Sequence, residues 1–397
     1  MFPDFTAGKR IKETMRSRTL MAVGVFFLLF ILFFPLDFLG DFQKEWTSFI
    51  YGDLTQWVVK NIFKTDHARI DFSSDSLSML VLIMILIMIS ALITALIRKK
   101  HLPEILHYSK EIIVLYIAVV LMKYGFDKIF KAQFYLPEPN ILYSRFGNMD
   151  RDILFWSTIG TSRLYSVSMG IFELVAALMI LFHKTRTLGL LFSIGILVNI
   201  VFINLGFDIS VKFFSLILLL MAVLGLKDEW IPLYRFLILR QKIQLDEEPQ
   251  ILRGAFPAWV FFKTAFIGFS MVAIFFPYFE SGNYNDDTAG RPLLHGAFKN
   301  VDANSDLQYI FFHRNYYIIL MDQDEKTKDF HYSQDSKNHL ILEDYQGGKM
   351  NVPFSYQKKD SLLTLTFGKE RVVAKEQNWK KMNALRPLFH MTIEGSK

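Results

Sequence analysis

The residue best placed to do chemistry is a glutamate in the middle of an apolar stretch. Glu173 lies midway between Arg163 and His183, and no other charged residue falls between those two. An ionised carboxylate is costly to hold in hydrocarbon, so Glu173 is expected to face a bundle interior, paired or protonated. Two interpretations stay open. Glu173 could handle protons or anchor a ligand, or it could make an interhelical hydrogen bond that only holds the bundle together.

Candidate partners for Glu173 lie on later apolar stretches. Asn199 falls in the middle of one such stretch and could meet Glu173 in the bilayer core, with Asn204 about one turn further along. Lys212 follows Asp208 by four residues, which is the spacing of neighbours on one helix face. An interfacial salt bridge is the favoured interpretation of that pair.

A further set of charged residues ends the apolar stretch at 104–124. Lys123, Asp127 and Lys128 would line the outer rim of the bundle, together with Asp208 and Lys212. A solvated or headgroup-binding face is the favoured interpretation of this rim. Attraction of an anionic substrate is the alternative.

Several classes of site are absent from the sequence. There is no cysteine, which excludes disulfides, thiol catalysis and iron–sulfur clusters. No apolar stretch carries an interior histidine, so the axial ligands of a membrane haem are missing. His313, His331 and His390 could approach one another, but surface positions are favoured, and no metal is expected. Phosphate-loop, His-Glu-x-x-His and Gly-x-Ser-x-Gly motifs are missing as well.

The elements that must position these residues are predominantly apolar. Of 397 residues, 52% are hydrophobic and only 21% are charged. A bilayer-spanning helix needs roughly 20 largely apolar residues. Seven stretches meet or approach that length: 19–36, 76–97, 104–124, 164–182, 188–207, 209–226 and 255–279. The first stretch lacks a small-residue cleavage site and is interpreted as an uncleaved anchor.

The basic residues predict an orientation for these spans. The tail at 280–397 holds 16 basic and 16 acidic residues, whereas residues 1–279 hold 28 basic against 22 acidic. The net charge of +6 therefore lies in the membrane part, and no nucleic-acid partner is expected. Basic clusters fall in the first 18 residues, at 98–100, at 184–186 and at 227–253, which seven spans place on one side. That side is expected to be cytoplasmic.

Two segments between the spans are more than linkers. Residues 45–63 carry apolar residues at helical spacing, which predicts an amphipathic helix lying in the interface or packed on the bundle. The aromatic stretch at 123–163, broken by Pro137 and Pro139, could cap the outer mouth of the bundle.

From residue 280 the sequence changes character. Short runs rich in β-branched and aromatic residues alternate with turn signals, which is typical of an antiparallel meander closing into a sandwich or barrel. The expected strands are 309–321, 339–345, 350–356, 361–367 and 370–376, with 387–394 as a further closing strand.

Residues 112–226 resemble the DoxX family of small four-helix membrane proteins. The resemblance is carried by Met122-Lys-Tyr-Gly-Phe-Asp-Lys-Ile-Phe130, by Met169-Gly-Ile-Phe-Glu-Leu-Val-Ala-Ala-Leu178 and by Asn204-Leu-Gly-Phe-Asp208. Gly125 with Lys128 matches that family's Gly-x-x-Lys element, and Gly170 with Glu173 matches its following Gly and Glu. The resemblance implies a four-helix core. It also implies a loose association with membrane redox chemistry, since some members of the family are subunits of a thiosulfate:quinone oxidoreductase.

The fold class expected is therefore a membrane all-α helical bundle of about seven transmembrane helices with a DoxX-like core, plus a C-terminal all-β antiparallel sandwich or barrel. The division is 1–100 for two spans and the interfacial helix, 101–228 for the core, 229–279 for a cytoplasmic linker and last span, and 280–397 for an extracytoplasmic β domain.

Three functions are consistent with this organisation. The first is an accessory or scaffolding subunit of the plasma (inner) membrane, not an enzyme on its own, whose β domain binds a membrane or periplasmic partner or a ligand. The second is a quinone-linked subunit of an oxidoreductase, with quinone at Glu173 and Asn199 as its cofactor. The third is a small proton-coupled transporter that uses Glu173.

Overall fold

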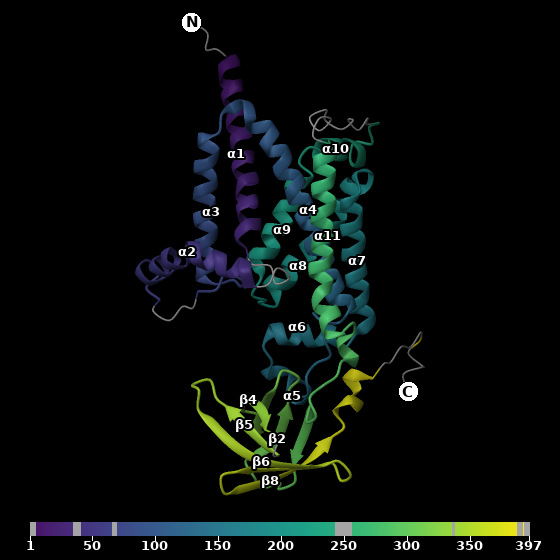
Figure 1. Ribbon diagram of the computed structural model, residues 1–397. Helices are drawn as coiled ribbons and strands as arrows, with labels where there is room; N and C mark the ends of the chain where they lie inside the picture. The colour runs from purple at the N-terminus through teal and green to yellow at the C-terminus, as the bar shows by residue number, and fades with distance from the viewer. Residues whose placement is uncertain are drawn as a thin grey trace. The chain divides into compact units, whose positions relative to one another are not determined.

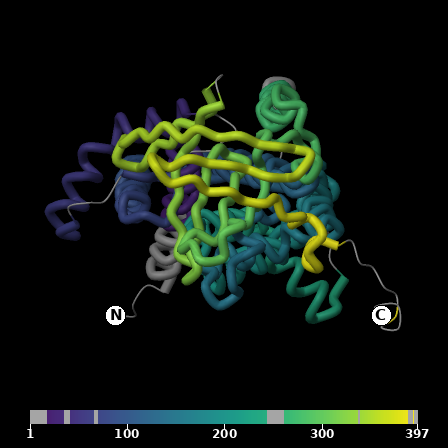
Figure 2. Tube along the Cα trace, turned by 90° about the horizontal axis from the view of Figure 1, so that it is seen from below, coloured from purple at the N-terminus to yellow at the C-terminus, as the bar shows by residue number. Residues whose placement is uncertain are grey.

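The computed structural model describes residues 5–34, 41–65, 70–242, 256–335, 338–386 and Thr392. Its contacts divide the chain into two compact units. The first unit comprises Met1–Phe130 and Val167–Tyr284, and the second comprises Lys131–Ser166 and Asn285–Lys397 (Figures 1 and 2). The predicted closing strand at 387–394 and the linker at 243–255 lie outside the described residues.

The first unit is helical. Its helices are α1 (Phe5–Phe33), α2 (Asp41–Asn61), α3 (Leu77–Leu96), α4 (Leu102–Ile129), α7 (Arg163–Leu181), α8 (Arg186–Gly206), α9 (Lys212–Gly225), α10 (Trp230–Leu237) and α11 (Phe256–Ser281). Each of the seven predicted spans coincides with a helix. By length and composition, five of these helical stretches could cross a membrane: Leu77–Leu96, Lys99–Ile129, Arg163–Leu181, His183–Gly206 and Val260–Thr288. Shorter apolar helices cover Arg18–Phe33 and Lys212–Gly225.

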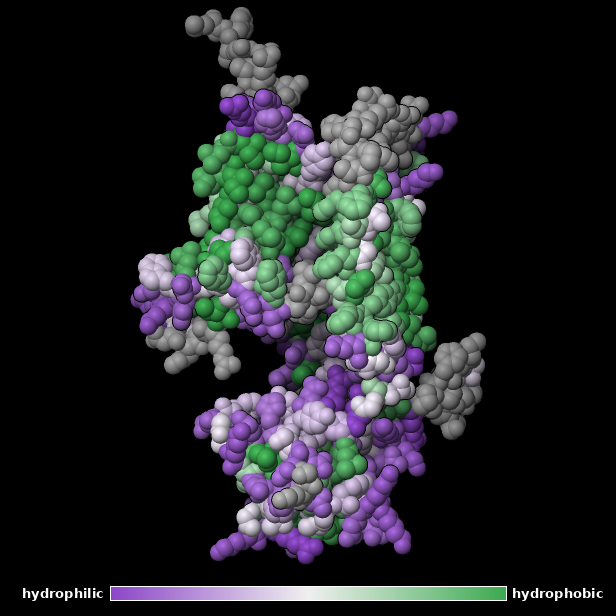
Figure 3. All heavy atoms as spheres, in the orientation of Figure 1, coloured by the Kyte–Doolittle hydropathy of each residue, from purple (hydrophilic) through white to green (hydrophobic). Residues whose placement is uncertain are grey.

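The core of the first unit is a cluster of large apolar side chains. α1 packs on α3 and α4, and α9 packs on α4 and α8. Phe34, directly after α1, stacks on Phe30 and on Phe214 of α9, with ring centroids 4.9 and 4.5 Å apart. The outward faces are apolar as well, and Figure 3 shows hydrophobic residues gathered over the sides of these helices.

Helix α2 has its polar side buried and its apolar side exposed. Gln43 donates hydrogen bonds to the carbonyls of Ile31 and Leu32 at 2.9 and 3.0 Å, and Thr47 donates to that of Phe33 at 2.7 Å. The carbonyls at the end of α1, which lack intrahelical partners, are thus satisfied by side chains of α2. The outward residues include Phe42, Phe49 and Trp57, which are 74%, 83% and 59% exposed.

The second unit contains a closed antiparallel barrel of eight strands in sequential order. The strands are β1 (Gly296–Asn300), β2 (Leu307–Phe312), β3 (Tyr317–Asp322), β4 (Thr327–Asp335), β5 (His339–Glu343), β6 (Lys349–Gln357), β7 (Leu362–Phe367) and β8 (Glu370–Gln377). β1 pairs with both β2 and β8, so Ala297 lies opposite Phe311 on one side and Gln377 on the other. Alternate residues point inward to form the core, as in β5, where Leu340 and Leu342 are buried.

The barrel confirms the β domain and refines its strands. The run expected at 309–321 is a hairpin of β2 and β3, because the chain turns at Tyr316, whose φ is 61°. β1 and β4 were not predicted. β1 is only five residues long, and β4 is mainly polar with Phe330 and Tyr332 as its inward residues. Closure comes from β1 pairing with β8.

The segment between α4 and α7 belongs to the second unit. It contains α5 (Pro139–Tyr143) and α6 (Arg151–Gly160). Apolar residues of this segment, including Leu142 and Tyr143, pack with Phe311 and Trp379 on the outer side of the barrel. Sequence analysis had placed 131–166 in the core at 101–228, whereas its contacts group it with the barrel. Apolar spacing could not reveal this association, since it depends on strands more than 140 residues later.

Candidate functional site

A buried ion pair joins α4 to α7 in the first unit. The Lys128 ammonium donates to both carboxylate oxygens of Glu173, at 2.9 and 2.8 Å. Lys128 is 6% exposed and Glu173 is 3% exposed. The partner of Glu173 is therefore a cation from the predicted outer rim.

Two glycines allow this pair to form. A Cβ atom built on Gly170 would lie 2.5 Å from the carbonyl oxygen of Gly125, and one built on Gly125 would lie 3.0 Å from that of Gly170. Small residues let transmembrane helices approach closely. Lys128 and Glu173 each follow one of these glycines by three residues, so the contact that brings the backbones together also brings the charges together.

A second polar group lies beside the ion pair. Lys123 and Asp127 form an ion pair on α4, and the Tyr278 hydroxyl of α11 donates a hydrogen bond to Asp127. Tyr124 follows Lys123 in sequence, and the centroid of its ring lies 5.5 Å from the Lys128 nitrogen. Three helices, α4, α7 and α11, therefore supply one polar cluster at this end of the unit.

The other predicted site residues lie elsewhere. Asn204 donates to the Ser215 hydroxyl at 3.0 Å and joins α8 to α9, whereas Asn199 is exposed on α8. Lys212 lies 2.7 Å from Asp208, and its ammonium is 3.5 Å from Asp75. These polar residues are distributed over helix contacts, and the structure does not gather them into one site with Glu173.

The second unit contains a buried charged cluster centred on Glu138. Glu138 is 4% exposed and precedes Pro139, which begins α5. Its Oε2 atom lies 2.9 Å from Nε2 of His295 and 3.4 Å from the backbone nitrogen of Arg314, which donates to it. Nε of Arg314 is 3.5 Å from the other carboxylate oxygen, and His313 lies 4.0 Å away.

This environment sets the ionisation of Glu138. Burial by itself favours the neutral acid, but the His295 hydrogen bond and the neighbouring His313, His295 and Arg314 together outweigh it and lower the pKa of Glu138. Burial lowers the pKa of His313, opposed by Glu138 and reinforced by Arg314. Glu138 is therefore a fixed negative charge at neutral pH, beside a neutral His313.

Further ion pairs extend the cluster. Asp286 pairs with Arg291 at 2.7 Å and also with Arg314, whose guanidinium lies 3.5 Å from the centroid of the Tyr135 ring. Arg314 thus contacts both acids, Glu138 and Asp286, and an aromatic face. The arrangement ties the barrel to the segment 131–166 through groups that satisfy one another.

A buried lysine holds the ends of that segment together. Lys131 is fully buried, donates to the Gly160 carbonyl at 2.6 Å and lies 3.8 Å from Asp287. Burial, with a smaller effect of Arg163, lowers the pKa of Lys131 despite the nearby acids. A Cβ on Gly160 would lie 2.2 Å from the Tyr135 carbonyl oxygen, so only glycine fits there.

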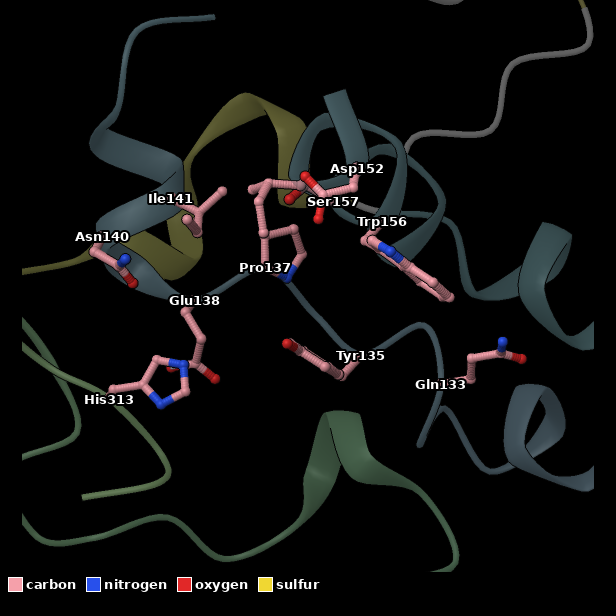
Figure 4. A pocket seen from close by; sticks show the side chains of 11 residues that line it. Gln133, Tyr135, Pro137, Glu138, Asn140, Ile141, Asp152, Trp156, Ser157 and His313 are labelled. Carbon is pink, nitrogen blue, oxygen red and sulfur yellow. The ribbon is translucent and has the colours of Figure 1, made fainter. Parts of the chain in front are cut away.

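A pocket of about 400 Å³ lies next to Glu138, within the second unit. Figure 4 shows Glu138 and His313 at one end of it and Trp156 and Gln133 at the other, with Tyr135 and Pro137 between. Asp152 and Ser157 of α6 form part of the wall. Apart from His313, every lining residue comes from the segment 131–166.

Sequence reasoning identified His313 and the prolines but missed Glu138, His295 and Arg314. The available signal was an acid between two prolines in an otherwise aromatic loop. The histidines predicted to approach one another are His313, His331 and His390, and that prediction did not include His295. The ring of His331 lies against that of Tyr317 in a tilted arrangement with centroids 4.0 Å apart, and His390 lies outside the described residues. Within the described ranges, no group of three or more His, Asp or Glu residues is arranged to hold a metal ion.

The residues that the structure describes define a class of protein: a helical unit with five helical stretches able to cross a membrane, in one chain with a closed eight-stranded barrel. The chain is 33% identical over 129 residues to the uncharacterized protein YwoB of Bacillus subtilis (strain 168), a match that covers 32% of this chain and 80% of that protein. The chain therefore belongs to the same family as YwoB. No family model matches the chain, and no solved structure matches it either.

Proposed function

We propose that this chain is a DoxX-like, multi-pass protein of the plasma membrane and an accessory subunit whose extracytoplasmic second unit binds a partner or ligand. The observation that carries the proposal is the Glu138 pocket. Glu138 is held in place by a hydrogen bond with His295 and an ion pair with Arg314, while a volume of about 400 Å³ beside it stays open. That arrangement suits binding better than proton transfer or covalent chemistry.

The surface of the first unit supports a membrane location. On α2 the polar residues Gln43, Thr47 and Thr55 are buried, while Phe49 and Trp57 are exposed. In water such an arrangement would leave a large apolar patch unprotected. At a bilayer interface the exposed side would lie among the lipid chains and headgroups.

The make-up of the second unit supports a crossing by α9 in addition to the five longer spans. Residues 131–166 follow α4, and the barrel follows α11, yet Glu138 contacts His295 and Arg314. With α3, α4, α7, α8 and α11 as the only crossings, three crossings would separate these contacting parts and place them on opposite sides. A crossing by α9 makes four and returns them to the same side. Within 209–226, Lys212 is the one charged residue.

The loops support the orientation. Arg98, Lys99 and Lys100 precede α4, and Lys184 lies between α7 and α8. With seven crossings these basic residues share a side with Lys227 and Arg235, and such an excess is typical of the cytoplasmic face. The barrel and the segment 131–166 would then be extracytoplasmic.

The Lys128–Glu173 pair favours this function over the alternatives. A quinone-linked subunit or a proton-coupled transporter would need Glu173 to contact a ligand or to exchange a proton. Both carboxylate oxygens of Glu173 already accept hydrogen bonds from Lys128 at 2.8–2.9 Å. A structural role in joining α4 to α7 accounts for both residues.

Single-cysteine labelling tests the location, because the natural chain has no cysteine. Ser333→Cys, exposed on β4, should react with a membrane-impermeant maleimide in intact cells. Lys184→Cys should react only after permeabilisation. The reverse pattern would contradict the orientation.

Purification tests the role. The full chain isolated from native membranes should bring down a partner or ligand in stoichiometric amount, and the recovery should fall in Trp156→Leu but not in Glu370→Gln, which is exposed on β8. A different outcome would support the redox role instead of the accessory role. In that outcome quinone copurifies in stoichiometric amount, Glu173→Gln abolishes its recovery, and Trp156→Leu leaves its recovery unchanged.

A further inference from the structure

The pocket in the second unit is lined by acids and aromatic rings. The acidic side chains that line the pocket are those of Glu138 and Asp152. His313 also lines the pocket, and it stays neutral at neutral pH because burial lowers its pKa. No arginine or lysine is among the residues that line the pocket.

The two acids are not equivalent. The negative charge of Glu138 is compensated by Arg314 and His295. Arg314 also pairs with Asp286, and Asp286 pairs with Arg291 as well. The carboxylate of Asp152, by contrast, makes no hydrogen bond or ion pair with any residue in the described part of the chain. The negative charge left over in the pocket is therefore that of Asp152.

The aromatic residues suit the same kind of ligand. Tryptophan presents the most favourable ring face to a cation, followed by tyrosine. Trp156 lies one helical turn after Asp152 on α6, so its indole and the carboxylate border the same part of the pocket (Figure 4). Arg314 already stacks on Tyr135 at 3.5 Å, which is a cation–aromatic contact beside the pocket.

Packing and helix electrostatics explain only part of this arrangement. Asp152 lies in the first turn of α6, where an acid interacts favourably with the helix dipole. Trp156 packs on Phe134, with centroids 4.9 Å apart. Neither effect requires an open volume of about 400 Å³ between the indole, the carboxylate and Glu138. A ligand with a complementary charge would fill that volume.

We propose that this pocket binds a small organic cation whose ammonium group lies between Asp152 and Trp156, with its carbon chain extending past Tyr135 toward Glu138. The inference rests on the proposed binding role of the second unit and names its ligand class. Neutral sugars and organic anions are the competing classes, and an anion would meet two carboxylates and no lining cation.

Calorimetry on the full-length protein in detergent tests the inference with three probes of one shape. Phenethylammonium should bind, whereas the neutral 2-phenylethanol and the anionic phenylacetate should bind at least about tenfold more weakly, since a hydrogen bond to a charged group is worth about 1.5–3 kcal/mol. Affinity for the cation should also fall as salt rises from 25 to about 150 mM.

Matched variants locate the site. Asp152→Asn should weaken phenethylammonium binding about tenfold, and Trp156→Leu should weaken it while Trp156→Phe retains part of the affinity. Glu370→Gln serves as the exposed acid control and should bind as the natural chain does. Far-ultraviolet circular dichroism should be unchanged in all four, so that loss of binding is separated from loss of fold.

Equal binding of the three probes, or a cation affinity unchanged by Asp152→Asn, would overturn the ligand class. The two proposals fail separately. Extracytoplasmic labelling of Ser333→Cys and recovery of a partner that depends on Trp156, without cation binding, would leave the accessory role and remove this inference. If phenethylammonium binds but Ser333→Cys is labelled only after permeabilisation, the ligand class stands and the extracytoplasmic accessory role is removed.

Discussion

The Lys128 ammonium contacts both oxygens of Glu173 across the α4–α7 interface, at 2.9 and 2.8 Å, and both side chains are almost completely buried. Each residue compensates the charge of the other, so removing one of them leaves the other less compensated in an apolar surrounding. The pair therefore supports predictions that separate a structural role from a chemical one.

Removing one member of the pair should be far worse than removing both. Glu173→Leu or Lys128→Met alone should destabilise the protein by about 3–5 kcal/mol, whereas the double variant should regain most of that loss. Thermal unfolding in detergent measures the effect. The exposed Asp208–Lys212 pair is the control, and breaking it should cost less than about 1 kcal/mol. A double variant as unstable as the single ones would contradict a structural pair.

The glycine contact between α4 and α7 should tolerate no methyl group. In Gly170→Ala the new Cβ would approach the Gly125 carbonyl oxygen to 2.5 Å, so the helices must separate and the Lys128–Glu173 contact must lengthen. We expect a lower unfolding temperature. Gly195→Ala on α8 is the matched control, because no atom lies within 4 Å of its Cβ position. That change should be neutral or stabilising by about 0.5–1 kcal/mol. Equal unfolding temperatures of the two variants would argue against the close approach.

Neutralising Glu138 should loosen the second unit. Glu138→Gln keeps the shape but leaves Arg314 less compensated, and the expected loss is about 1–3 kcal/mol, the cost of leaving a buried polar group unsatisfied. Hydrogen exchange at the amides of β1 and β2 would follow this unit separately from the helices. Glu343→Gln, at an exposed pair with Lys349, should leave exchange unchanged. Identical protection in both variants would contradict the role assigned to Glu138.

Acidification should destabilise the second unit. The pKa values of His313 and Glu138 are both lowered in the folded protein, so the unfolded chain binds more protons and stability rises with pH. As pH falls from 7, stability should decrease first below the ordinary pKa of 6.5 for His313 and then below the ordinary 4.5 for Glu138. Within the described residues, the charged or titratable groups around them include His295, Arg314, Arg291 and Asp286. Hydrogen exchange of the barrel at pH 7, 5.5 and 4 measures this, and His313→Gln should remove the upper step. Increasing protection at low pH would contradict the prediction.

The sequence by itself determined the apolar helices and most of the strands. Apolar runs of near-bilayer length predict each of the seven helices, because a helix satisfies its backbone internally and its position follows from local composition. Alternation and turn residues likewise predict strands such as β5 and β7, since the side-chain period of a strand is local information. The isolation of Glu173 in its apolar stretch was enough to mark it as a residue that needs a partner.

Only the tertiary structure decided the partners. The partner of Glu173 is Lys128, 45 residues earlier, because Gly125 and Gly170 bring two backbones together. Residues 131–166 belong with the barrel because Glu138 contacts His295 and Arg314, which are at least 157 residues away in the chain. β1 closes the barrel by pairing with β8. Each of these contacts depends on surfaces that exist only after separate elements have folded, and local spacing carries no record of them.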